Sequence, residues 1–173
     1  MTHDVGETEQ HCEAAATAGQ YLTFNLASEV YGLEILKIQE IIGMMNVTIV
    51  PKTPEYVRGV INLRGKVIPV IDLRSVFGMP SKEDTERTCI IVVQVRAGGG
   101  ERTVGFIVDE VSEVLHIAAE QMEAPPSIGT SADNDFILGM GKVGEKVIML
   151  LDADRILGEA ALQNVAISGE EGL

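Results

Sequence analysis

The sequence predicts a mainly β protein built from two similar small β-barrels that share one core. Short apolar runs with alternating or β-branched character recur along the chain, and glycine or proline turns separate them. Hydrophobic residues make up 46% of the chain and aromatic residues only 4%, so the core has to consist mainly of aliphatic side chains. An internal repeat indicates that the same arrangement occurs twice.

The predicted strands are short, and few long helices are expected. The first three are one alternating run and two that follow a polar turn, the third having the sequence ILKIQEII. A polar, proline-containing loop over residues 118–135 interrupts the second half. Strands are expected at residues 21–26, 30–33, 35–42, 57–63, 66–71, 89–95, 104–108, 137–140 and 145–151.

Turn residues define the segment around residues 57–78. Arg64-Gly65 is expected to form a two-residue hairpin loop, with glycine at a position of positive φ. Pro69 inside the second strand of this hairpin suggests an edge strand or a position without a ladder hydrogen bond. Asp72 is a suitable N-cap for a short helix that Gly78 would end. One further helix is expected at the C-terminus.

The repeat relates the two halves of the chain. Residues 59–78 align without gaps to residues 139–158, an offset of 80, with identities that include Gly59/Gly139 and Asp72/Asp152. Residues 31–42 align to residues 104–115, an offset of 73, with their apolar positions largely in step. Each half alone, at about 70 residues, would be only marginally stable, so packing the halves together is physically useful.

Charge and composition exclude several classes of protein. The formal net charge is −13, and the first 20 residues contain four acids and no lysine or arginine, which argues against nucleic-acid binding. No apolar run approaches the roughly 18 residues of a membrane span, and the N-terminus lacks the features of a secretory signal. Two cysteines do not make a disulfide framework, so a cytoplasmic location is expected.

The residues that could carry chemistry do not form a recognisable catalytic, cofactor or metal site. Residues 139–144 spell GxGxxG, but a strand follows them where a dinucleotide-binding fingerprint needs a helix. His116 is the sole histidine outside the N-terminal tail and lacks a nucleophile motif. Asp109, Glu110 and Glu113 are interpreted as the solvated face of a strand. A non-enzyme is therefore expected, with an enzyme that uses His116 or the glycine loops as the weaker alternative.

The positive charge points to protein binding. Residues 58–74 (RGVINLRGKVIPVIDLR) contain four cations and one acid. Alternation through the hairpin puts Val60, Asn62 and Arg64 on one face, opposite Ile61 and Leu63. If Ile61 and Leu63 fill the core, an apolar residue, an amide and a guanidinium share the outer face, a mixture typical of an interface with an arginine anchor.

These segments resemble the CheW family, the coupling proteins of bacterial chemotaxis. The resemblance rests on YGLEILKIQEI at residues 31–41, RGVINLRG at 58–65, PVIDLR at 69–74 and GFIVDEVSEVL at 105–115. It covers about residues 20–160. The expected division is an acidic tail at 1–19, a CheW-like domain at 20–160 and a second tail at 161–173.

The resemblance implies two five-stranded SH3-like barrels around a shared core and no catalytic activity. It also implies an adaptor that joins the regulatory domain of the histidine kinase CheA to the cytoplasmic tips of methyl-accepting chemotaxis receptors, in arrays at the membrane. A CheW-like scaffold of another chemosensory pathway remains an alternative. The residues expected to contact receptor or kinase are Ile38, Glu40, Arg58, Gly59, Val60, Asn62, Arg64, Val111 and Val114.

Overall fold

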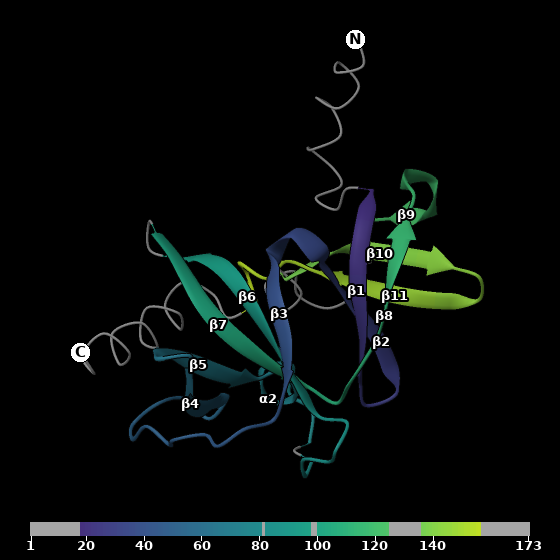
Figure 1. Ribbon diagram of the computed structural model, residues 1–173. Coiled ribbons are helices and arrows are strands. Elements are labelled where there is room, and N and C mark those ends of the chain that lie inside the picture. The colour runs from purple at the N-terminus through teal and green to yellow at the C-terminus, as the bar shows by residue number, and fades with distance from the viewer. Residues whose placement is uncertain (1–17, 81, 98–99, 125–135, 157–173) are drawn as a thin grey trace.

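The computed structural model describes residues 18–80, 82–97, 100–124 and 136–156, and β-strands dominate this part of the chain (Figure 1). Its strands are β1 (Gly19–Leu26), β2 (Glu29–Glu34), β3 (Ile38–Gly43), β4 (Val57–Leu63), β5 (Lys66–Asp72), β6 (Cys89–Ala97), β7 (Gly100–Val108), β8 (Glu110–Ile117), β9 (Met122–Glu123), β10 (Ile137–Val143) and β11 (Lys146–Leu151). Its helices are the 3₁₀ turns η1 (Ile35–Lys37) and η2 (Ala119–Gln121) and the short α2 (Leu73–Val76).

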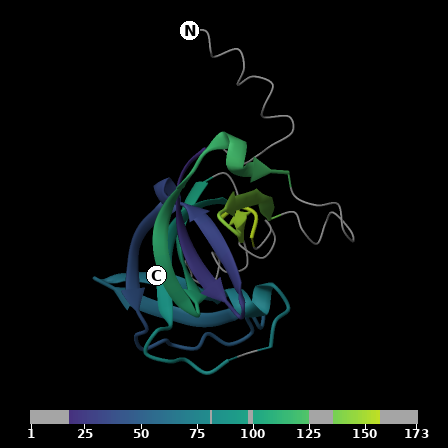
Figure 2. The ribbon, with the colours of Figure 1, turned by 90° about the vertical axis from the view of Figure 1, so that its right-hand side faces the viewer.

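The strands form two sheets of the same design. One sheet has the order β3-β6-β7-β5-β4, and the other has the order β8-β1-β2-β11-β10 with the two-residue β9 added at its edge. The first two strands of the chain therefore belong to the sheet completed by its last strands, and Figures 1 and 2 show the purple β1 beside the green β8. We call the β3–β7 unit barrel 1 and the other unit barrel 2.

The register of the two sheets confirms the repeat predicted from the sequence. Val70 pairs in parallel with Gly105 in barrel 1, and Leu150 pairs in parallel with Gly32 in barrel 2. These partners are related by the offsets of 80 and 73. The antiparallel hairpins β4–β5 and β10–β11 also have an irregularity at the same point, after Val57 and after Ile137. The structure thus consists of two SH3-like barrels with interchanged strands.

Three apolar clusters fill the interior of the described part of the chain. One lies within barrel 1 and includes Ile61 and Ile90, and a second lies within barrel 2 and includes Tyr21 and Ile148. The third and largest is built from both barrels. Strand β6 contributes to two clusters, with Ile90 and Val92 on one face and Ile91, Val93 and Val95 on the other. Burial on both faces explains why this strand is continuously apolar in sequence.

A chain of aromatic rings crosses the boundary between the barrels. Phe24 stacks on Tyr31 at 6.0 Å between ring centroids, Tyr31 contacts Phe77 at 5.5 Å, and Phe77 stacks on Phe136 at 4.7 Å. Phe77 follows α2 of barrel 1, whereas the other three belong to barrel 2. Aromatic pairs contribute about 0.5–1.5 kcal/mol beyond their buried area, so four rings join the halves despite the low aromatic content.

Most local expectations are confirmed, and the strand expected over residues 35–42 is wrong at its start. The predicted strand over residues 35–42 begins as the 3₁₀ turn η1, and only Ile38–Gly43 is extended. Asp72 caps α2 as predicted, because its Oδ1 accepts a hydrogen bond from the backbone N–H of Arg74 at 3.0 Å. Gly78 follows the helix with a φ of 77°.

Pro69 lies in an interior strand, because β5 is flanked by β7 and β4. Its partner across the hairpin is Val60, whose N–H and C=O both bond to Thr48 instead of to β5. Val60 and Pro69 therefore form a pair without ladder hydrogen bonds. The Pro69 nitrogen points away from β4 toward β7, and the pairing of β5 with β7 begins only at the next residue, Val70. Of the two positions that the sequence suggested, the edge is wrong and the non-bonded position is right.

The possible C-terminal helix and most of the loop at 118–135 lie outside the described residues. The beginning of that loop forms η2 and β9. In the described part of the chain, no helix is long and apolar enough to cross a membrane.

Candidate protein-binding site

The tip of the β4–β5 hairpin is a tight two-residue turn. Leu63 pairs with Lys66, and the two residues between them have positive φ values, 55° at Arg64 and 85° at Gly65, as in a type I′ turn. The Asn62 side chain turns toward this loop, where its Oδ1 accepts a hydrogen bond from the Gly65 N–H at 2.8 Å. Asn62 thus stabilises the turn that presents Arg64.

Arg64 points outward and forms a two-point ion pair with Glu40 of β3. Its Nη1 and Nη2 donate to the two carboxylate oxygens at 2.7 and 2.5 Å, while 68% of the Arg64 side chain remains exposed. The hydrogen bonds from Arg64 lower the pKa of Glu40. Strands β3 and β4 are the two outer strands of the barrel 1 sheet, so this pair also shows that the sheet curls back on itself.

Arg58 and Gly59 have different surroundings. Arg58 donates two hydrogen bonds to Asp84 at 3.2 and 3.3 Å and lies 3.6 Å from Asp72, so its guanidinium already has two acidic partners. Gly59 has a φ of 150°, and a Cβ there would lie 2.2 Å from the carbonyl oxygen of Thr48. Glycine is required at this position because the loop before β4 approaches its backbone closely.

The apolar members of the predicted site divide between core and surface. Ile38 on β3 and Val111 on β8 are half-buried and pack against the cluster shared by the barrels. Val114 on β8 is 46% exposed. Its counterpart in barrel 1 is Ile41, 41% exposed, which sequence reasoning missed although it lies at the offset of 73. Leu36 in η1, at 85%, was also missed.

The nine predicted residues therefore form separate groups. Glu40, Asn62 and Arg64 belong to one hydrogen-bonded unit around the hairpin tip. Gly59 and Val60 lie beside the loop that carries Thr48, and Arg58 faces Asp84. The members on β8 belong to barrel 2. The groups present more than one face of the molecule.

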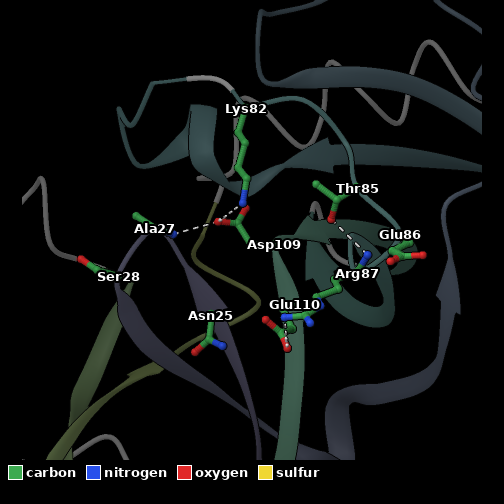
Figure 3. A pocket seen from close by; sticks show the side chains of 9 residues that line it. All are labelled: Asn25, Ala27, Ser28, Lys82, Thr85, Glu86, Arg87, Asp109 and Glu110. Atoms are coloured by element: carbon green, nitrogen blue, oxygen red, sulfur yellow. Dashed lines mark hydrogen bonds and ion pairs between the residues drawn. The ribbon is translucent and has the colours of Figure 1, made fainter.

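A cleft of about 570 Å³ lies between the β1–β2 turn, residues 82–87 and the beginning of β8 (Figure 3). Its lining mixes both charges, with Lys82 4.0 Å from Asp109 and Arg87 3.7 Å from Glu110. These internal ion pairs do not make a catalytic constellation.

The other chemical candidates also have structural positions. His116 is exposed on β8 opposite Gln20, and residues 139–144 belong to β10 and the turn before β11. The expectation that Asp109 lies on a solvated strand face is wrong, because it lies between β7 and β8 and bonds to Arg74 with only 13% of its side chain exposed. Among the described residues, no cluster of three His, Cys, Asp or Glu could hold a metal ion.

A double SH3-like barrel with an exposed arginine turn and exposed aliphatic strand faces defines a protein-binding scaffold. The CheW-like domain family matches residues 20–161. Chemotaxis protein CheW of Klebsiella aerogenes is 40% identical over 90% of this chain and 93% of its own length, and CheW of Thermotoga maritima is 31% identical over 83% and 91%.

The structure resembles a solved relative as well. The crystal structure of the scaffolding protein TtCheW from Thermoanaerobacter tengcongensis superposes with a TM-score of 0.74 and 35% identity, covering 84% of this chain and 96% of the other. The chain therefore belongs to the CheW-like family of chemotaxis scaffold proteins.

Proposed function

We propose that this chain is a non-catalytic adaptor that couples the cytoplasmic tips of chemoreceptors to the histidine kinase CheA. Family membership supports the coupling role. The outward-facing ion pair of Arg64 and Glu40 is the main observation that supports the location of the binding site. Guanidinium groups on a rigid turn lose little conformational freedom on binding, which makes Arg64 a suitable anchor for a partner carboxylate.

The proposed mechanism uses geometry alone. Barrel 1 offers the hairpin tip, and barrel 2 offers the face of β8 that carries Val114. Two partners could occupy these faces together, and a change in the receptor would then alter the contact geometry at the kinase. Transient signalling contacts of this kind bury less than about 1,200 Å² each.

The proposal extends to location and chain organisation. We place the protein in the cytoplasm, recruited to membrane-associated receptor arrays by its partners. The acidic tails at 1–19 and 161–173 would lie outside the binding domain at 20–160. The kinase contact would involve the CheW-like regulatory domain of CheA.

Reconstitution of kinase control with purified receptor tips, CheA and this chain tests the proposal. We expect Arg64→Glu to abolish receptor-dependent control of the kinase, with partner affinity reduced about tenfold or more, because a central arginine anchor is lost and its charge reversed. Lys142→Glu is the matched control, because Lys142 occupies the equivalent hairpin of barrel 2 and pairs with Glu123 at 2.6 Å.

Full coupling by the Arg64→Glu protein would contradict the site, and failure of the unaltered chain to bind either partner in pull-down would contradict the adaptor role. Loss of coupling in Lys142→Glu alone would move the site to barrel 2.

A further inference from the structure

The chain passes between the barrels at two connections, and a carboxylate ion pair lies at each. The connection from β2 to β3 is η1, which contains Lys37, and the connection from β7 to β8 is Asp109 alone. Asp109 bonds to Arg74, which follows β5 of barrel 1, and Lys37 bonds to Asp154, which follows β11 of barrel 2. We call Arg74–Asp109 the first latch and Lys37–Asp154 the second latch.

The first latch is bidentate and largely buried. Arg74 Nε and Nη2 donate to the Asp109 carboxylate at 2.8 and 2.6 Å, and the backbone N–H of Ala27 donates to it at 2.9 Å. Arg74 belongs to α2 of barrel 1 and Ala27 to the β1–β2 turn of barrel 2, so the carboxylate joins both barrels. Figure 3 shows Asp109 between Ala27 and Lys82.

The second latch has the same components in the opposite arrangement. Lys37 Nζ donates to Asp154 at 3.0 Å, and the backbone N–H of Arg96 donates to the same carboxylate at 2.8 Å. Asp154 follows β11 of barrel 2, whereas Arg96 belongs to β6 of barrel 1. This carboxylate therefore also joins the barrels.

The repeat relates one residue of each latch, and the two equivalent residues have opposite charge. Arg74 and Asp154 are 80 positions apart, and each follows a cap, because Asp72 and Asp152 accept the backbone N–H two residues later at 3.0 and 2.9 Å. Arg74 supplies the cation of its latch, whereas Asp154 supplies the anion and Lys37 on the connection supplies the cation. In both cases the carboxylate accepts a backbone N–H near the end of the first strand of a hairpin.

Burial distinguishes the latches. The side chains of Arg74 and Asp109 are 12% and 13% exposed, and those of Lys37 and Asp154 are 33% and 27% exposed. A bidentate arginine–carboxylate pair away from water is stronger and better oriented than a single lysine contact near the surface. The second latch is therefore the easier of the two to open.

We propose that these charge-reversed ion pairs fix the orientation of one barrel on the other, and that Lys37–Asp154 is the latch that opens when the orientation changes. The four residues of the two latches are positioning groups, since they act through the barrels they join. This inference concerns the chain by itself and does not rest on the identity of its partners.

The test measures the orientation directly. Spin labels placed through Lys66→Cys and Lys146→Cys, in a Cys12→Ser/Cys89→Ser background, occupy exposed equivalent hairpin positions on the two barrels. Each of the single substitutions Lys37→Asp and Asp154→Arg places two like charges opposite each other. We expect each to broaden the distance distribution measured by pulsed electron paramagnetic resonance and to lower Tm by about 1–3 °C.

The double variant Lys37→Asp/Asp154→Arg is the decisive control, because it restores a pair of opposite charges and gives the second latch the charge order of the first. We expect it to restore the parent distribution and Tm. Parent-like distributions in both single variants would overturn the proposal, and so would a double variant as broad as the single ones.

Discussion

Single residues in this protein are constrained by close contacts that their type alone does not reveal. Gly59 and Gly65 both have positive φ, yet a Cβ at Gly59 would meet the Thr48 carbonyl at 2.2 Å, whereas a Cβ at Gly65 would meet nothing within 4 Å. The two glycines of one motif therefore serve different needs. Gly59 leaves space for a neighbouring backbone, whereas Gly65 is needed only because glycine adopts a positive φ without strain.

Alanine substitutions at these two positions distinguish the steric requirement at Gly59 from the conformational requirement at Gly65. We expect Gly65→Ala to lower the free energy of unfolding by about 1 kcal/mol, the cost of a left-handed residue. Gly59→Ala should cost about 2–4 kcal/mol, because steric strain adds to the same term. Urea unfolding of both variants measures the difference, and equal losses would show that the Thr48 loop moves away freely.

Two half-buried aspartates have pKa shifts of opposite sign. Burial by itself would raise the pKa of Asp109, but hydrogen bonds from Arg74 and Ala27 outweigh it and the pKa is lowered. Burial raises the pKa of Asp152, and its hydrogen bond from the Asp154 N–H offsets this only in part. A lowered pKa contributes stability that is present above the unfolded value of about 3.9 and lost as pH falls, and a raised pKa does the reverse.

Asparagine at these positions should therefore give opposite pH profiles. We expect Asp109→Asn to cost about 1–3 kcal/mol at pH 7, with the difference from wild type closing below about pH 4. For Asp152→Asn the free energy of unfolding should improve relative to wild type as pH rises from 4 to 7, while the amide oxygen can still cap the turn. Chemical unfolding at several pH values checks both signs, and parallel profiles would contradict them.

At the scale of the element, the β4–β5 hairpin combines a structural and a binding feature in one ion pair. Arg64 bonds to Glu40 on the opposite outer strand, and this contact both closes the sheet and directs the guanidinium outward. Stability and binding can be separated by reversing both charges, because the pair survives whereas the surface it presents to a partner is inverted.

We expect the Arg64→Glu/Glu40→Arg double variant to match the wild-type Tm and still fail to couple receptor to kinase. Thermal melts and the reconstituted kinase assay are the measurements. If the double variant recovers coupling, the ion pair matters for the shape of the barrel and Arg64 is not the group that a partner reads.

At the scale of the whole molecule, the two barrels share their largest apolar core. The largest apolar cluster takes residues from both sheets, including Leu33 of β2 and Phe106 of β7, each 0% exposed. The aromatic chain that ends at Phe136 crosses the same boundary. Unfolding either barrel would expose this cluster, so the two barrels should unfold together.

Phe106→Ala tests this cooperativity. We expect a loss of about 3–5 kcal/mol and one shared transition, since a large buried ring is removed from the common cluster. Tyrosine fluorescence and far-ultraviolet circular dichroism, followed during urea unfolding, should give coincident curves. Two separated transitions in the unaltered protein would show that the barrels are independent units.

Much of the architecture follows from local sequence. Alternation, β-branched residues and the Arg64-Gly65 turn specify strands and hairpins through side-chain sterics and φ preferences, and the repeat offsets specify the doubling. The outward direction of Arg64 also follows, because its neighbours in alternation, Ile61 and Leu63, face inward. The start of β3 could not be predicted from the sequence, because nothing in the run at 35–42 indicates that its first three residues form η1 instead of a strand.

Only the tertiary structure decided which distant residues meet. The partners of Arg64, Asp109 and Asp154 lie 24, 35 and 117 positions away, and no local pattern encodes such pairings. Sheet curling and the interchange of β1 and β2 bring these charges together. Sequence alone determined the strands and their repetition, whereas long-range packing determined the contacts that orient one barrel on the other.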